Sequence, residues 1–309
     1  MFALLILLAS AAPAAQKAPA PRTTASDGIY TVTVIDLSPR FLDFYRAAKG
    51  KDPETRWRLW QERYGFAAVP PTPEGMRLAR KLLEGAWERY PQILSLVERG
   101  AAALEPAPMK VLIDVATLLG LTEPFQVQVV AYVGAFDGNA FTAAQDGVIT
   151  VAMPIEMDRN ERELVFRHEM THAVHIATAG LSGGWERSIA EVVFQEGLAM
   201  HATRALVPGR HERSYVEHTP GWYEAAMAKA PQILAGILRE LQRSDSETVS
   251  RFTVGSGTTG IEREAYVAGW LVIGELLGQG RTFPELARVP STQMATLVRT
   301  TIERLLAKR

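Results

Sequence analysis

Apolar positions recur at helical spacing over most of the chain. Residues 40–105 have this spacing, broken at the Pro-rich stretch 69–73, and so does the chain from residue 220 onward apart from a Gly-, Ser- and Thr-rich loop at 254–260. Residues 29–37 alternate apolar and polar side chains, which predicts a strand or an extended lead-in. The pattern therefore predicts an α+β fold that is mostly helical.

Three short apolar runs in the middle of the chain predict a small sheet. The runs comprise residues 127–136, 139–145 and 148–153. They are separated by Asp137-Gly138 and Asp146-Gly147, and Asp-Gly pairs favour type I′ hairpin turns because both central residues need a positive φ. We therefore expect a three-stranded antiparallel meander next to the helix that follows it.

Two helices are expected after this region. The first covers residues 160–178, begins with Glu161 and Glu163 in its first turn, and is apolar almost all round, which is typical of a buried helix. The second covers residues 188–207 and ends at Pro208-Gly209.

Charge and cysteine content limit the possible partners and metal ligands. The chain has 33 Lys and Arg against 34 Asp and Glu, and no basic run that would favour nucleic acid or an anionic membrane surface as a partner. It has no cysteine, so a transition metal would have to be held by histidines and carboxylates.

The N-terminus is typical of a secretory signal peptide. An apolar run at residues 2–8 precedes small residues with Ala-x-Ala character at 12–15, although no Lys or Arg comes before the run. We predict a signal peptide at 1–15 and an Ala/Pro-rich linker at 16–28, and hence export to the periplasm or the medium. The alternative is a retained short anchor, but a membrane span needs about 20 apolar residues, and no later segment is long enough.

The first of the two expected helices carries the motif His-Glu-x-x-His, in the sequence FRHEMTHAVH at residues 166–175. His168 and His172 are four residues apart, so their side chains project from one helix face and can share one ion at zinc–nitrogen distances of about 2.0–2.1 Å. Glu169 is rotated by about 100° from His168. It can therefore reach the open position of a metal and act as a general base.

A chance occurrence of the motif is the alternative, expected in roughly one in a hundred sequences of this length. Two histidines and a glutamate on a buried apolar helix must find partners or destabilise the fold. A metal ion would satisfy them, which favours a metal site.

A catalytic zinc needs a third protein ligand. Four residues are candidates: Glu186, Glu191, Glu196 and His201. Glu191 is explained by a capping box with Ser188, Glu186 lies in a Gly-rich loop, and His201 falls about 140° round the helix from Glu196, which predicts a structural or exposed residue. Glu196 lies among apolar residues, followed by Gly197, which permits close approach of another backbone. We expect Glu196 to be the third ligand.

HEMTH followed by EGLA on the next helix resembles the gluzincin zinc metallopeptidases. The wider pattern is also similar to a bacterial family of unknown function predicted to be zinc-dependent proteases, through VITVAMP, FQEGLAMHA and AYVAGWLVIGELL, over residues 127–278. The resemblance implies a zincin-like fold, Zn²⁺ as cofactor and a peptide or protein substrate. It makes His168, His172 and Glu196 the metal ligands and Glu169 the base. It also implies that a strand of the sheet binds the substrate backbone.

The sequence departs from these families at several positions. Many gluzincins have an Asp four residues after the ligand Glu, and here that position is Met200. Metzincins need a Gly and a further His where this chain has His175 and Thr178, so that class is excluded. His175 is expected to be a hydrogen-bonded core or cleft histidine, or an adventitious ligand. By analogy with some gluzincins Tyr266 is a candidate donor to the oxyanion; a buried structural aromatic is the alternative.

The sequence thus predicts an exported zinc metallopeptidase. A helical N-terminal region (29–125) would precede a zinc-binding catalytic core (126–210), and a helical C-terminal region (211–309) would complete the cleft. A non-catalytic zinc-binding protein or a scaffold protein of the cell envelope is the alternative. The intact Glu169 disfavours the first of these two.

Overall fold

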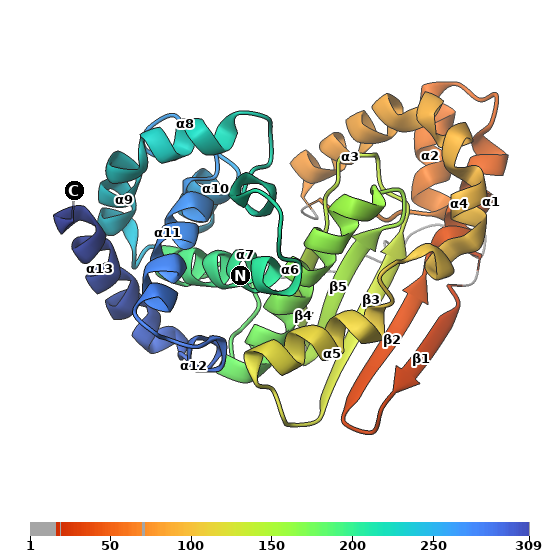
Figure 1. The fold of residues 1–309 in the computed structure, drawn as a ribbon. Helices are drawn as coiled ribbons and strands as arrows, with labels where there is room; N and C mark the ends of the chain where they lie inside the picture. The colour runs from red at the N-terminus through yellow and green to blue at the C-terminus, as the bar shows by residue number, and fades with distance from the viewer. Residues whose placement is uncertain (1–16, 19, 70–71, 309) are drawn as a thin grey trace. The chain divides into compact units, whose positions relative to one another are not determined.

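The computed structural model describes residues 17–18, 20–69 and 72–308, which lie in two compact units (Figure 1). The first unit lies within residues 1–112 and 124–166, and the second within 113–123 and 167–309. Two of the three boundaries fall inside helices, α5 (Pro108–Leu119) and α6 (Arg159–Ala179), and the third lies between Glu123 and Pro124. The described chain is α+β and mostly helical with one small sheet, as the hydrophobic pattern predicts.

The sheet belongs to the first unit and is mixed. Its strands are β1 (Arg22–Ser26), β2 (Tyr30–Asp36), β3 (Phe125–Tyr132), β4 (Phe141–Gln145) and β5 (Val148–Pro154), in the order β1-β2-β3-β5-β4. The pairs β1–β2 and β4–β5 are antiparallel, whereas β2–β3 and β3–β5 are parallel. The expected strand at 29–37 is confirmed as β2. The strand β1, in contrast, lies in a segment that the sequence assigns to the linker.

The predicted antiparallel meander is only partly correct. The β4–β5 hairpin turns at Asp146 and Gly147, whose φ angles of 51° and 77° fit the expected Asp-Gly turn. The strand β3, however, pairs in parallel with β5, so β5 lies between β3 and β4 and Asp137-Gly138 joins no paired strands. The physical reason is burial: β3 is enclosed at most of its positions, which is typical of a central parallel strand.

Helices pack around an aromatic core in the first unit. They are α1 (Ser38–Ala48), α2 (Pro53–Arg63), α3 (Pro73–Ala86) and α4 (Leu94–Arg99), with 3₁₀ segments at Trp87–Ile93 and Gly100–Ala103. Phe41 is fully buried, and its ring contacts those of Tyr64 and Tyr90 at centroid distances of 5.4 and 4.8 Å. The Tyr64 hydroxyl also donates to the carbonyl of Val133 and accepts from its N–H, both at 2.8 Å, which ties the helices to the chain after β3.

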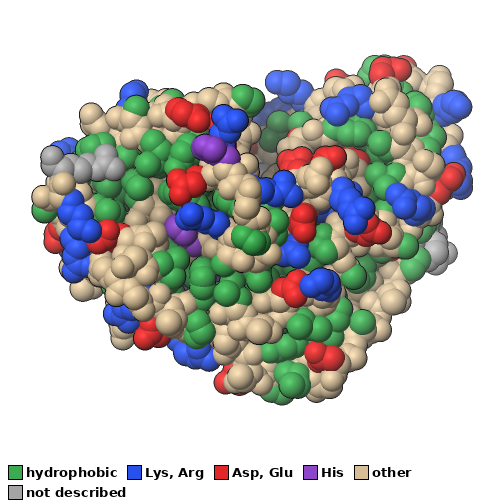
Figure 2. Space-filling model, viewed as in Figure 1, with side chains coloured by type: hydrophobic (Ala, Val, Ile, Leu, Met, Phe, Trp, Pro, Cys, Tyr) green, Lys and Arg blue, Asp and Glu red, His purple; other side chains and the backbone are tan. Residues whose placement is uncertain are grey.

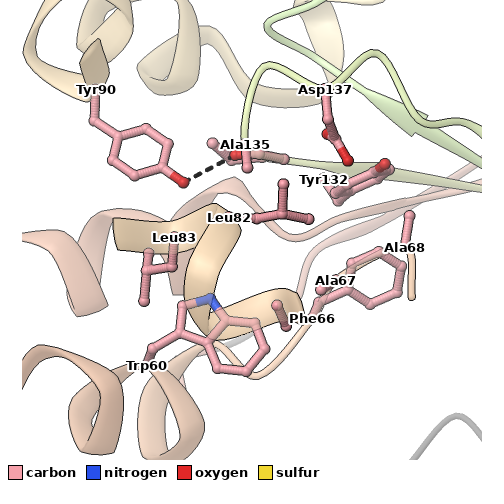
Figure 3. A pocket seen from close by; sticks show the side chains of 13 residues that line it. Trp60, Phe66, Ala67, Ala68, Leu82, Leu83, Tyr90, Tyr132, Ala135 and Asp137 are labelled. Atoms are coloured by element: carbon pink, nitrogen blue, oxygen red, sulfur yellow. Dashed lines mark hydrogen bonds between the residues drawn. The ribbon is translucent and has the colours of Figure 1, made fainter. Parts of the chain in front are cut away.

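A small pocket opens beside this core (Figure 3). Its walls come from Trp60 on α2, Leu82 and Leu83 on α3, and the chain that follows β3. The Tyr90 hydroxyl donates to the carbonyl of Gly134 at 3.0 Å along one wall, and Tyr132 and Asp137 also line the pocket. The residues that line the pocket are therefore mainly aromatic and aliphatic.

The second unit is helical and is built around α7. Besides parts of α5 and α6 it contains α7 (Ile189–Leu206), α8 (Trp222–Ala228), α9 (Ala230–Glu240), α10 (Ser246–Thr253), α11 (Glu264–Gly278), α12 (Phe283–Ala287) and α13 (Ser291–Ala307), with a 3₁₀ segment at Glu212–Tyr215. Contacts with α10, α11, α12 and α13 leave every residue of α7 from Ile189 to Thr203 buried. The helices expected at 160–178 and 188–207 are thus confirmed as α6 and α7.

The predicted signal peptide lies outside the described residues. Among the helices that are described, none is long and apolar enough to cross a membrane. On the face drawn in Figure 2, basic and acidic side chains are interspersed with apolar ones and do not gather into a patch of one sign.

Candidate metal centre

The helix α6 begins with its own cap and places the histidines in the interior. The Asp158 carboxylate accepts a hydrogen bond from the N–H of Asn160 at 2.8 Å, satisfying one of the free donors of the first turn. Farther along, Met170, Ala173 and Val174 are fully buried. His172 is also buried, and His168 is half-buried. The expected buried helix is therefore confirmed, and its two histidines lie one turn apart.

The helix α7 is anchored at its start and closely packed in its middle. Its cap residue Ser188 accepts a hydrogen bond from the N–H of Glu191 at 3.2 Å, as expected, but the Glu191 carboxylate accepts from Gln195 at 2.8 Å. A Cβ atom on Gly197 would lie 2.3 Å from the carbonyl oxygen of Gly269 on α11, so both backbones need glycine there. This close contact fixes Glu196, which precedes Gly197, against α11.

Three side-chain atoms from the two helices converge. The Nε2 atom of His168 lies 3.1 Å from a carboxylate oxygen of Glu196 and 3.1 Å from the Nε2 atom of His172, and the same Glu196 oxygen lies 3.4 Å from His172 Nε2. Two ligands held about 2.0–2.1 Å from a tetrahedral zinc are about 3.3–3.4 Å apart. The spacing of all three atoms is therefore close to that of a ligand set.

The chemistry of these atoms also fits a metal. Two imidazole nitrogens that face each other can share only one proton, whereas one ion accepts the lone pairs of all three atoms at once. Glu196 is buried, with 4% of its surface exposed, and an unpaired carboxylate in such a place is costly. The group formed by His168, His172 and Glu196 can therefore bind a metal ion, and a set of two nitrogens and one oxygen suits the divalent first-row metals.

Electrostatics keep the carboxylate of this group ionised. Burial raises the pKa of Glu196, but the imidazoles of His172 and His168 outweigh burial and hold this pKa well below its ordinary value. Burial lowers the pKa of His168, and the hydrogen bond and charge of Glu196 outweigh it, so that the net pKa is raised. The centre therefore presents an anionic oxygen to a cation at neutral pH.

Arg187 is part of the centre, and the sequence did not indicate it. Its guanidinium Nη2 donates to the second carboxylate oxygen of Glu196 at 3.3 Å, and 18% of its side chain is exposed. The residue lies in the connection between α6 and α7, one position before the cap Ser188. Its role depends on how that connection folds, and no spacing rule in the sequence could have identified it.

We expect Arg187→Ala to weaken metal affinity by about 10–100-fold, the usual effect of removing a group that orients a metal ligand. The loss follows because Glu196 would then be free to rotate away from the two histidines. Titration of metal-free protein with Zn²⁺ against a competing chelator measures the effect. Arg281→Ala, which removes an exposed arginine elsewhere in the second unit, is the matched control, and equal affinities in both variants would contradict the assignment.

The residue four positions after Glu196 is a methionine that packs in the core. Met200 is buried, with 1% of its surface exposed. The Nδ1 atom of His172 is buried and has no hydrogen-bond partner within the described residues, although a ligand histidine usually donates from this atom. Arg187 thus supports the glutamate of the centre, whereas no described residue supports Nδ1 of His172.

The other sequence candidates lie outside the cluster. Glu186 is exposed, and Glu191 makes the helix-start contacts described above. His201 is structural: its Nε2 atom lies 2.8 Å from the carbonyl of Trp270, its ring stacks on that indole, and burial lowers its pKa to about 4. His175 is a core residue beside Phe194, but the expected hydrogen bond is absent, since neither ring nitrogen has a partner among the described residues. Burial lowers the pKa of His175 to about 3.

Glu169 and Tyr266 lie near the metal centre but are not among its three candidate ligands. Glu169 is half-buried and follows His168 on α6. Tyr266 lies on α11, one turn before Gly269, and is partly exposed. Burial raises the pKa of Tyr266, and the charges of Glu196 and Glu169 raise it further, so the hydroxyl keeps its proton at neutral pH.

Comparison with known proteins finds neither a matching family model nor a curated protein of significant sequence similarity.

Proposed function

We propose that this protein is a zinc-dependent metallopeptidase of the gluzincin type, with a zincin-like catalytic arrangement. One observation carries the proposal: His168, His172 and Glu196 bring three metal-ligating atoms together, and Glu169 is the neighbour of the first ligand. Three protein ligands are typical of catalytic zinc sites, whereas structural zinc sites usually have four. The number of ligands in the described cluster therefore supports an enzyme over a zinc-stapled scaffold.

Each residue has a role in the proposed reaction. Zn²⁺, when bound, supplies a Lewis acid that polarises a carbonyl oxygen and makes water more acidic. Glu169 takes the proton of the attacking water and passes it to the leaving amine. Tyr266 donates its hydroxyl hydrogen to the negative charge that develops on the carbonyl oxygen. Arg187 holds Glu196 in position. The substrate is a peptide or protein, and the proposed export of the enzyme rests on the N-terminal sequence alone.

We expect the zinc-loaded protein to cleave members of a diverse peptide mixture, with products identified by mass spectrometry. The new ends would show whether cleavage is internal or terminal and which residues flank the bond. Removal of the metal with a chelator should stop product formation. Zn²⁺ added in excess of the chelator should restore it. Products that persist in the metal-free protein would contradict the proposal, as would a zinc-loaded protein that yields no products from any peptide.

A further inference from the structure

The loop between α10 and α11 is held in one conformation by a buried carboxylate. Glu264, the first residue of α11, is fully buried. Its carboxylate accepts hydrogen bonds from the N–H and hydroxyl of Thr259, both at 2.7 Å, and from the hydroxyl of Thr258 at 3.0 Å. Gly257 has a φ of +54°, and a Cβ there would lie 2.1 Å from the Glu264 carboxyl carbon. The loop is therefore built to a fixed shape.

This loop holds Arg263 in an unusual backbone conformation. Arg263 has a φ of 57°, in the left-handed region that residues with a side chain rarely adopt. Its N–H donates to the carbonyl of Gly255 at 3.0 Å, which fixes the conformation from the other end of the loop. Strained residues of this kind persist only where their surroundings over-determine them, and they cluster at functional sites.

The side chain of Arg263 packs on an aromatic ring, but no described carboxylate balances its charge. Its guanidinium carbon lies 3.9 Å from the centre of the Tyr266 ring. Within the part of the chain that the structure describes, no carboxylate pairs with it, and its Nε atom is buried without a hydrogen-bond partner. The neighbouring Glu262 lies instead 3.5 Å from His218. A half-buried guanidinium with unused donors is suited to bidentate binding of a carboxylate from outside the chain.

The guanidinium lies beside the metal centre. Tyr266, on which it rests, is one helical turn from Gly269, which touches the backbone next to Glu196. A group bound by Arg263 would therefore sit next to the proposed reaction site.

We propose that Arg263 binds a carboxylate of the substrate, so that the enzyme selects peptides whose cleaved bond lies near a free carboxylate. The inference rests on the proposed peptidase function and specifies its substrate class. The carboxylate belongs to the C-terminus of the peptide or to an acidic side chain, which share the same chemistry. The ring of Tyr266 orients the guanidinium by stacking against it, and this contact also keeps Tyr266 beside the metal centre.

Equilibrium binding tests this inference without relying on turnover. Calorimetry would measure the binding of three N-acetylated peptides to the zinc-loaded protein. The first has a free C-terminus, the second is its C-terminal amide, and the third is an amide whose last residue is Glu. If the wild type cleaves them, the Glu169→Gln variant takes its place. The carboxylate peptides should bind at least about tenfold more tightly than the uncharged amide, since a charge-assisted pair is lost in the amide. Arg263→Gln should abolish this preference. Arg263→Lys should retain part of it, because lysine keeps the charge but lacks the planar guanidinium that binds a carboxylate through two N–H groups.

Arg299→Gln, which removes the same charge from an exposed position on α13, should leave the preference unchanged, and thermal unfolding shows that each variant is folded. Preference for the free acid identifies the terminal carboxylate, and preference for the Glu amide identifies the side chain; both support the inference. Equal binding of all three peptides, no binding of any, or a preference that survives Arg263→Gln would overturn it. Carboxylate binding that depends on Arg263 in a protein without peptidase activity would refute only the proposed function.

Discussion

Glu169→Gln should reduce peptide hydrolysis by at least about 10²–10⁴-fold, the usual contribution of a positioned general base, while leaving the metal content unchanged. The amide has nearly the same size as the carboxylate but cannot accept the proton of the attacking water. Metal binding should persist because the converging ligand atoms belong to His168, His172 and Glu196 and not to Glu169. The measurements are kcat/KM on a cleaved peptide and bound metal per chain.

Glu186→Gln is the matched control for this variant. It makes the same chemical change at an exposed carboxylate in the connection that leads to α7. Activity should be close to that of the wild type. If Glu169→Gln retained turnover with its metal in place, the assignment of the base would be wrong, and a metal lost together with activity would make Glu169 part of the ligand set.

The sequence predicted the helices of the centre well because their limits are set locally. The second helix begins at a Ser cap that the structure contains, and the first ends before Gly180, whose φ of 64° the helix itself cannot use. The sheet was harder to predict. The turn at Asp146-Gly147 is a local signal, but the parallel pairing of β3 with β2 and β5 joins segments distant in sequence, and no residue type marks it.

The same contrast applies to the residues of the centre. His168 and His172 are brought together by helical spacing alone, and Glu196 could be chosen because a buried carboxylate needs a partner. Arg187 and Arg263 lie in connections whose shapes come from hydrogen bonds at a distance, such as those from Thr258 and Thr259 to Glu264. The sequence likewise predicted a hydrogen-bonded core or cleft histidine at His175, whereas the structure shows a core residue whose ring nitrogens have no partner among the described residues.

Glu196→Ala should weaken metal affinity by more than about 100-fold. Removing a residue that only orients a ligand usually costs about 10–100-fold, and the loss of a ligand should cost more. The variant removes one of three converging atoms and leaves His168 and His172, which alone make a weak site. Affinity for Zn²⁺ is measured by chelator competition. Since Ala also leaves space in a closely packed helix, Glu196→Gln gives the same test with the volume kept, and it should bind metal more weakly than the wild type.

Glu191→Ala separates the loss of a ligand from the loss of any buried carboxylate on α7. Glu191 is also buried and lies near the start of the same helix, but its carboxylate bonds to Gln195. This variant should lower the unfolding temperature and keep the metal affinity of the wild type. If Glu196→Ala and Glu196→Gln bound Zn²⁺ as tightly as Glu191→Ala, the third ligand would have to be another residue. The contacts of Glu196 with the two histidines would then be only a hydrogen bond and a charge interaction.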